Sequence, residues 1–209
     1  IKARIDSVKD MRLSSKDAGT RAMSAKSHQF REMNCATQHT LIVPAVSSES
    51  RPYLPVGLLD RRCAVSNSAF ALYDADIFNL SLIASRLHLV WIGTVCGKMK
   101  TDFRYSNTLG WNTFPVPVLT EQNKADLTAC AEAIILAREA HFPATIADLY
   151  NPETMPENLR KAHERNDEVI ERIYIGRRFK NDTERLEKLF EMYTKMTADT
   201  GVKKKGKKT

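Results

Sequence analysis

The segment 98–105 alternates charged residues with apolar or aromatic ones. A period of two predicts one half-buried β-strand with its charges on a single face. That face comprises Lys98, Lys100, Asp102 and Arg104, and the opposite face comprises Met99, Phe103 and Tyr105. Because Lys and Arg donate to guanine O6 and N7 while Asp accepts from cytosine N4, such a strand can read DNA base edges. A solvated edge strand protected by lysines has the same pattern, so the segment alone leaves both interpretations open.

Two other polar groups are candidates for contact with nucleic acid. Arg51 and Tyr53 lie in the turn-rich, proline-containing stretch 46–55, from which either side chain can reach a phosphate. Asn67 and Ser68 lie in the middle of a strand predicted over 64–73 and are candidates for contact with base edges. Small polar residues in a strand also satisfy neighbouring backbone groups, which is the alternative interpretation.

The sequence contains no convincing catalytic or metal-binding motif. We find no glycine-rich loop after a strand, no nucleophile elbow and no metal-ligand spacing, and His88 stands alone within an apolar helical pattern. The cysteines Cys35, Cys63, Cys96 and Cys130 are isolated from one another, which favours reduced thiols and a cytoplasmic protein. We therefore expect no catalytic residue, metal or cofactor in this chain.

The predicted elements indicate an α+β fold. Short strands are expected at 40–44, 64–73 and 98–105, and an apolar helix over 76–94. From Thr120 the pattern changes to long helices, with further helices at 158–175 and 182–196. The expected architecture is a small mixed β-sheet domain with packed helices, followed by an all-α C-terminal domain. The apolar stretch 77–95 contains Arg86 and His88, which argues against a membrane span.

Charge divides the chain into three segments. Residues 1–117 carry 15 Lys+Arg against 9 Asp+Glu, residues 118–200 carry 12 against 16, and residues 201–209 carry five lysines. We therefore expect a polyanion to bind the first segment. We predict a binding domain at 1–117, a helical domain at 118–200 and a disordered basic tail at 201–209. Because the chain begins with Ile1, we also expect it to be a fragment of a longer protein.

Several separated motifs carry a family resemblance that covers most of residues 40–196. They include SSESRPYLPVG at 47–57, VSNSA at 65–69, SRLHLVW at 85–91, GKMKTDFRYS at 97–106, NTFPVP at 112–117, IYIG at 173–176 and ERLEKLF at 184–190. In this order they resemble the C-terminal part of MmeI-like DNA methyltransferases, which include the type IIL restriction-modification enzymes. The resemblance implies a target recognition domain followed by a helical extension.

The resemblance also implies which residues read DNA. Lys100, Asp102 and Arg104 fall where these enzymes choose bases, and Ser68 falls near the same surface. Lys100 with Asp102 suits a G·C pair, and Arg104 suits a neighbouring purine. Arg51, Lys98 and Tyr53 are the candidates for phosphate contacts. For Arg51 and Lys98, as for Arg86, structural pairing is the alternative.

The same resemblance sets what lies outside this chain. In the family, an upstream domain holds S-adenosylmethionine and an N-P-P-Y-type motif for adenine N6 methylation, and neither feature occurs in this sequence. The expected partners are double-stranded DNA and that upstream methyltransferase domain of the same polypeptide, with no membrane. The alternative is a non-catalytic structural or protein-interaction module whose basic half has only general electrostatic affinity for nucleic acid.

Overall fold

The computed structural model describes residues 1–31 and 33–205, and the chain divides into two compact units, Ile1–Ala36 and Thr37–Thr209. The first unit contains α1 (Lys2–Leu13), α2 (Ala18–Ala22) and a short 3-10 helix, η1 (Met23–Lys26). The Arg12 guanidinium donates to the carbonyl oxygens of Met23, Lys26 and Gln29, at 2.8 Å each, and so holds the end of α1 against the segment after it. The residues of these three helices are at most half-buried.

The second unit contains two small antiparallel sheets. One has the strand order β3 (Gly57–Asp60), β1 (His39–Pro44), β4 (Ala69–Tyr73), and the other has the order β2 (Val46–Ser47), β6 (Asp102–Arg104), β5 (Gly97–Met99). The α+β fold class is confirmed, but the prediction that the small β-sheet is mixed is wrong. All four strand pairings in the two sheets are antiparallel.

The apolar helix predicted over 76–94 is two helices, α3 (Phe78–Ile83) and α4 (Arg86–Val95). The break lies at Ser85, whose hydroxyl accepts from the His88 N–H at 3.1 Å and thereby caps α4. An apolar periodicity does not reveal such a break, since both helices bury Leu and Ile side chains at similar spacing.

The second half of the chain is helical, as predicted. It contains η2 (Asn107–Trp111, a π-helix), α5 (Glu121–Glu139), α6 (Ile146–Leu149), α7 (Glu157–Ile175) and α8 (Asp182–Lys205). Thr120 and Asn123 form the capping box that begins α5, and Gly176, at a φ of 76°, ends α7 in the left-handed conformation that glycine tolerates. The helix α8 runs through Lys205, so the backbone of 201–205 is helical where a disordered tail is predicted, and residues 206–209 lie outside the described part.

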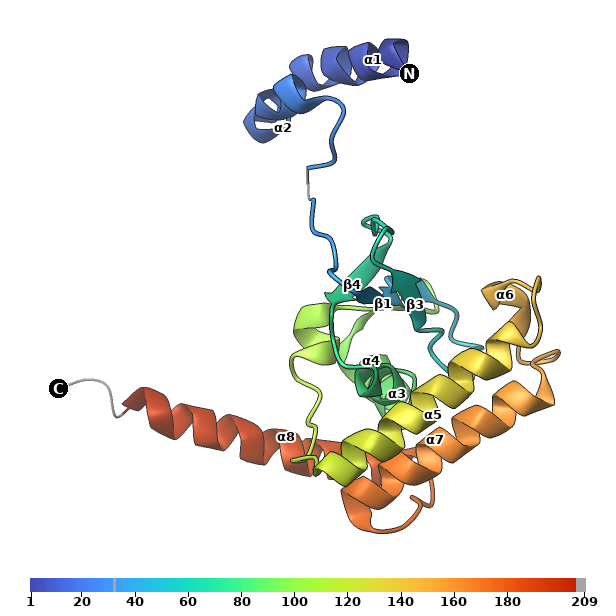
Figure 1. The fold of residues 1–209 in the computed structure, drawn as a ribbon. Coiled ribbons are helices and arrows are strands. Elements are labelled where there is room, and N and C mark those ends of the chain that lie inside the picture. The colour runs from blue at the N-terminus through green and yellow to red at the C-terminus, as the bar shows by residue number, and fades with distance from the viewer. Residues whose placement is uncertain (32, 206–209) are drawn as a thin grey trace. The chain divides into compact units, whose positions relative to one another are not determined.

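The long helices pack directly on the sheet-containing half. Figure 1 shows α5 and α7 side by side and antiparallel, beneath the β3-β1-β4 sheet and the helices α3 and α4. One core cluster joins Leu41 of β1 to Ala131 of α5, and a second joins Trp91 of α4 to Ile170 of α7 and Leu189 of α8. The predicted boundary after residue 117 therefore lies inside one compact unit.

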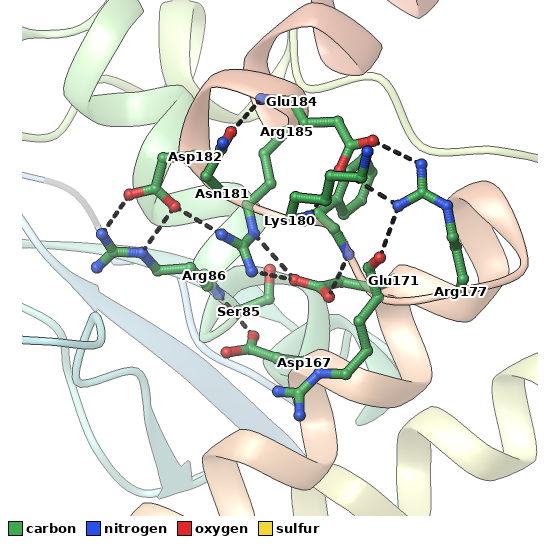
Figure 2. Close-up of polar contacts among 12 residues, drawn as sticks. Ser85, Arg86, Asp167, Glu171, Arg177, Lys180, Asn181, Asp182, Glu184 and Arg185 are labelled. Atoms are coloured by element: carbon green, nitrogen blue, oxygen red, sulfur yellow. Dashed lines mark hydrogen bonds and ion pairs between the residues drawn. The ribbon is translucent and has the colours of Figure 1, made fainter.

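A charged cluster joins the first turn of α4 to α7 and α8 (Figure 2). Arg86 forms an ion pair with Asp182 at 2.5 Å, and its backbone N–H donates to Asp167 at 2.7 Å. Arg185 pairs with both Asp182 and the fully buried Glu171. Of the two roles predicted for Arg86, phosphate contact or structural pairing, the structure shows the pairing.

Candidate nucleic-acid interface

Residues 97–104 form a β-hairpin rather than one strand. Strand β5 pairs with β6 in the register Met99↔Asp102, Lys98↔Phe103 and Gly97↔Arg104, which leaves Lys100 and Thr101 as the turn. Lys100 has a φ of 58°, a left-handed conformation that L-residues other than Gly, Asn and Asp seldom adopt. The prediction of a continuous strand is wrong because neither turn residue is Gly, Asn, Asp or Pro, so the usual sequence signal of a hairpin is missing.

The hairpin also divides the charged residues between two faces. Directly paired residues share a face, so Lys98 lies with Phe103, whereas Asp102 and Arg104 lie on the other face with Met99. The Lys98 ammonium accordingly lies 5.6 Å from the centre of the Phe103 ring. The predicted row of four charges on one face is therefore wrong, since the turn exchanges the faces between the two strands.

The outer face of the hairpin borders a pocket of about 730 Å³. Arg104 and Ser68, from segments 36 positions apart in the numbering, both line it, together with Asn67, Val46 and Met99. The backbone of Ala45 brings these segments together, because its N–H donates to the Ser68 carbonyl at 3.0 Å and its carbonyl accepts from the Tyr105 N–H at 2.9 Å. The structure thus unites two of the predicted base-reading residues, Ser68 and Arg104, in one site.

Three predicted base-reading side chains remain available to a ligand. Lys100 and Arg104 are exposed and Asp102 is half-buried. Within residues 1–31 and 33–205, no hydrogen bond or ion pair engages these three side chains. This differs from the many charged side chains of α7, α8 and the turn between them that pair with one another. Two cations and one acceptor are thus left without a partner along the hairpin.

The predicted phosphate-contact residues have different environments. Lys98 pairs with Glu49 at 3.1 Å, and both side chains are exposed. Arg51 is half-buried and donates to the Ser47 hydroxyl at 3.4 Å, next to β6 in the sheet. Tyr53 is only 8% exposed and stacks on the His163 ring, with centroids 4.1 Å apart. A surface role for Tyr53 is therefore wrong, because its ring is part of the core.

Sequence reasoning missed the apolar part of this site. Val46 is paired with Arg104 and shares its face, and Met99 shares the same face from β5. Both are partly exposed, at 38% and 49%. Val46 has no local sequence signal for this position, because β2 reaches β6 only through a pairing between distant segments.

The buried histidines have the character of structural groups. Burial lowers the pKa of His88 to about 3 and lowers the pKa of His163 well below its ordinary value, so both rings are neutral near pH 7. Each ring bonds a tyrosine hydroxyl, His88 to Tyr105 at 3.0 Å and His163 to Tyr150 at 2.8 Å. Among the described residues there is no cluster of three or more potential metal ligands, and no helix is long and apolar enough to cross a membrane.

Comparisons with known proteins agree on one family. Residues 1–118 match the family model of the MmeI target recognition domain, and residues 119–200 match that of the MmeI C-terminal domain. DNA methyltransferase A of Bacillus subtilis (strain 168) is 41% identical over 197 residues, which are 94% of this chain and 22% of that protein.

A solved structure gives the same result. The type IIL restriction-modification enzyme MmeI, solved in complex with DNA, superposes with a TM-score of 0.88 at 32% identity over 94% of this chain and 26% of that one. The chain thus spans about a quarter of the length of these relatives. The two family models together cover residues 1–200, and we conclude that the chain belongs to the MmeI family and comprises its target recognition and C-terminal domains.

Proposed function

We propose that this chain selects the DNA sequence on which a longer adenine-N6 DNA methyltransferase acts. The observation that carries the proposal is the β5–β6 hairpin, where the side chains of Lys100 at the turn and of Asp102 and Arg104 along β6 have no partner among the described residues. The major groove of B-DNA admits a two-stranded β-ribbon, so a hairpin with unpaired charged side chains suits this role.

The chemistry of the hairpin fits base readout. Lys100 donates to guanine and Asp102 accepts from cytosine, which together suit one G·C pair. Arg104 reads a neighbouring purine, and Ser68 reads a base edge from the lining of the same pocket. Different residues on one small surface then specify successive base pairs.

The phosphate contacts come from the other side of the hairpin. Lys98 exchanges its exposed partner Glu49 for a phosphate oxygen, and Arg51 approaches the backbone from the loop after β2. Such contacts position the protein without reading sequence. Tyr53 has no part in this proposal, because it is buried.

The chemical step belongs to the rest of the polypeptide. S-adenosylmethionine is bound upstream, and the target adenine leaves the duplex and enters that catalytic domain. The residues of this chain only bind the duplex and fix its position. We propose as domains the recognition part at 1–117 and the helical part at 118–200, with α7 and α8 bracing α4.

Duplex binding by the 209-residue chain is the first test. We expect the affinity to fall steeply with salt concentration, because each phosphate contact releases counterions. Selection from a randomised duplex library should enrich a defined motif. No binding at low salt, or equal binding to all sequences, would support the alternative, a structural module with general electrostatic affinity.

A charge exchange tests the base contacts. Lys100→Glu with Asp102→Arg should change the preferred base pair at one position of the enriched motif, because donor and acceptor change places. The matched control is Glu157→Lys with Lys161→Glu, which reverses an exposed ion pair on α7. Like the hairpin variant, this control leaves the net charge of the chain unchanged. We expect the control to keep the original motif. An unchanged motif in the hairpin variant would refute the assignment of Lys100 and Asp102.

A further inference from the structure

A buried hydrogen bond lies directly beneath the recognition hairpin. The Nε2 atom of His88 on α4 is 3.0 Å from the hydroxyl of Tyr105, the residue that follows Arg104. Their exposed fractions are 0% and 6%, so neither side chain is placed to donate freely to DNA. The bond joins the rigid helix to the strand that carries Arg104.

The strand β6 rests on α4 at two points. An ideal Cβ at Gly93 would lie 3.2 Å from Cε1 of Phe103, which marks one close contact, and the His88–Tyr105 bond marks the other. Two residues along a strand span roughly 6.6 Å and five residues along a helix roughly 7.5 Å, so the two contacts match in spacing. Arg104 lies between Phe103 and Tyr105 and projects from the opposite face.

Aromatic rings enclose the hydrogen bond. The His88 ring meets Phe114 edge-on at 4.6 Å, and Tyr105 packs against Phe70 at 5.6 Å between centroids. Tyr105 also lines the pocket that contains Arg104 and Ser68. A shift of Tyr105 would therefore move both the floor of the pocket and the end of β6.

His88 is a costly residue for a purely apolar core. Its Nδ1 atom is buried and has no hydrogen-bond partner among the described residues. An unpaired buried polar atom destabilises the folded state, whereas an apolar side chain of similar size would avoid this loss. The hydrogen bond to Tyr105 is the specific interaction that an apolar side chain would not provide.

We propose that His88 and Tyr105 are positioning residues for base discrimination, because they fix β6 on α4 and so set where Arg104 meets the base edge. This inference rests on the proposed function in DNA recognition. It adds residues that act through Arg104 and do not touch the duplex.

Tyr105→Phe tests the inference, because it removes the hydroxyl and keeps the ring. In library selection, we expect discrimination at the base pair that Arg104→Ala also relaxes to fall about three- to tenfold, the factor for one net hydrogen bond. Discrimination at other positions and binding to non-specific duplex should stay unchanged. His88→Leu should lower discrimination at this base pair to the same extent. His88→Gln keeps a hydrogen-bonding group, so it should lower discrimination less than His88→Leu does.

Tyr174→Phe is the matched control. Its hydroxyl is equally buried and donates to the Pro115 carbonyl at 2.9 Å, away from the pocket. It should lower the melting temperature to a similar extent without changing discrimination. If the wild-type chain enriches a motif and Tyr105→Phe discriminates as well as Tyr174→Phe, the positioning role is refuted while the recognition function stands. If the wild-type chain enriches no motif, the proposed function fails and the inference fails with it.

Discussion

The turn residue Lys100 combines an unfavourable backbone conformation with an exposed, unpaired charge. Among the described residues other than glycine, it shares a positive φ only with Asp74. In Asp74 local hydrogen bonds offset the unfavourable φ, because its carboxylate accepts from the backbone N–H groups of Thr37 and Gln38. The Lys100 side chain forms no such bond among the described residues, so nothing in its surroundings offsets the unfavourable φ, which is consistent with the proposed contact with DNA.

Lys100→Gly should therefore stabilise the chain and weaken its sequence selectivity. Glycine adopts a positive φ without the Cβ clash, so we expect a gain of about 1 kcal/mol in the free energy of unfolding, measured by denaturant titration. Thr101→Gly is the control at the other turn position, where φ is not positive, and it should lower stability. A loss of stability in Lys100→Gly would contradict this account of the turn.

At the scale of elements, α4 is the platform on which the interface is built. One side of α4 contacts Tyr105 through His88 and Phe103 through Gly93. In its first turn, Arg86 pairs with Asp182 of α8. In the proposed function, the C-terminal helices would support recognition by holding α4 in place.

The buried ion pair between Glu171 and Arg185 should dominate this bracing. Glu171 is 0% exposed and accepts from Arg185 and from the Phe179 N–H at 3.0 Å. Glu171→Ala leaves the mostly buried guanidinium of Arg185 with only the partly exposed Asp182 as partner, and it also removes the acceptor of the Phe179 N–H. We therefore expect a loss of up to about 3–5 kcal/mol in the free energy of unfolding.

Glu157→Ala is the control for this prediction. It removes a carboxylate of the same helix whose pairs with Lys161 and Arg160 are exposed, and it should cost less than about 1 kcal/mol. Equal losses for the two variants in denaturant titration would show that the buried pair does not brace α4.

For the whole molecule, one buried carboxyl group couples stability to pH. Burial raises the pKa of Asp167 from 3.8 to about 7. The hydrogen bond that its carboxylate accepts from the Arg86 N–H partly opposes this rise in pKa. Between these two values the folded chain holds a proton that the unfolded chain has released. The stabilisation from this proton is complete below about pH 4 and is lost as the pH rises through about 7.

Asp167→Asn should remove this dependence, since the amide oxygen still accepts from Arg86 but does not titrate. We expect the difference in unfolding free energy between wild type and variant to change by about 1 kcal/mol per pH unit between pH 4 and 7, with the wild type losing stability relative to the variant as the pH rises. Denaturant titrations of both proteins at several pH values between 4 and 7 measure this difference. Glu164→Gln, exposed on the same helix, controls for the loss of one carboxyl group, and parallel curves for wild type and Asp167→Asn would contradict the prediction.

The sequence by itself determined the helical half and the family. The long helices follow from apolar positions three and four residues apart and from local caps such as Thr120, and these signals depend only on neighbouring residues. The family motifs are likewise short, ordered segments. The candidate base-reading residues Lys100, Asp102 and Arg104 were also named from their local pattern.

The tertiary structure decided how those residues are arranged. A period of two fits a strand, but the hairpin turn at Lys100 and Thr101 exchanges the two faces, so only the pairing shows which charges lie together. The meeting of Ser68 with Arg104 depends on the backbone of Ala45, and the burial of Tyr53 depends on His163, 110 positions away in the numbering. Such contacts between distant segments leave no periodic trace in the sequence, because they arise only when the separate elements pack.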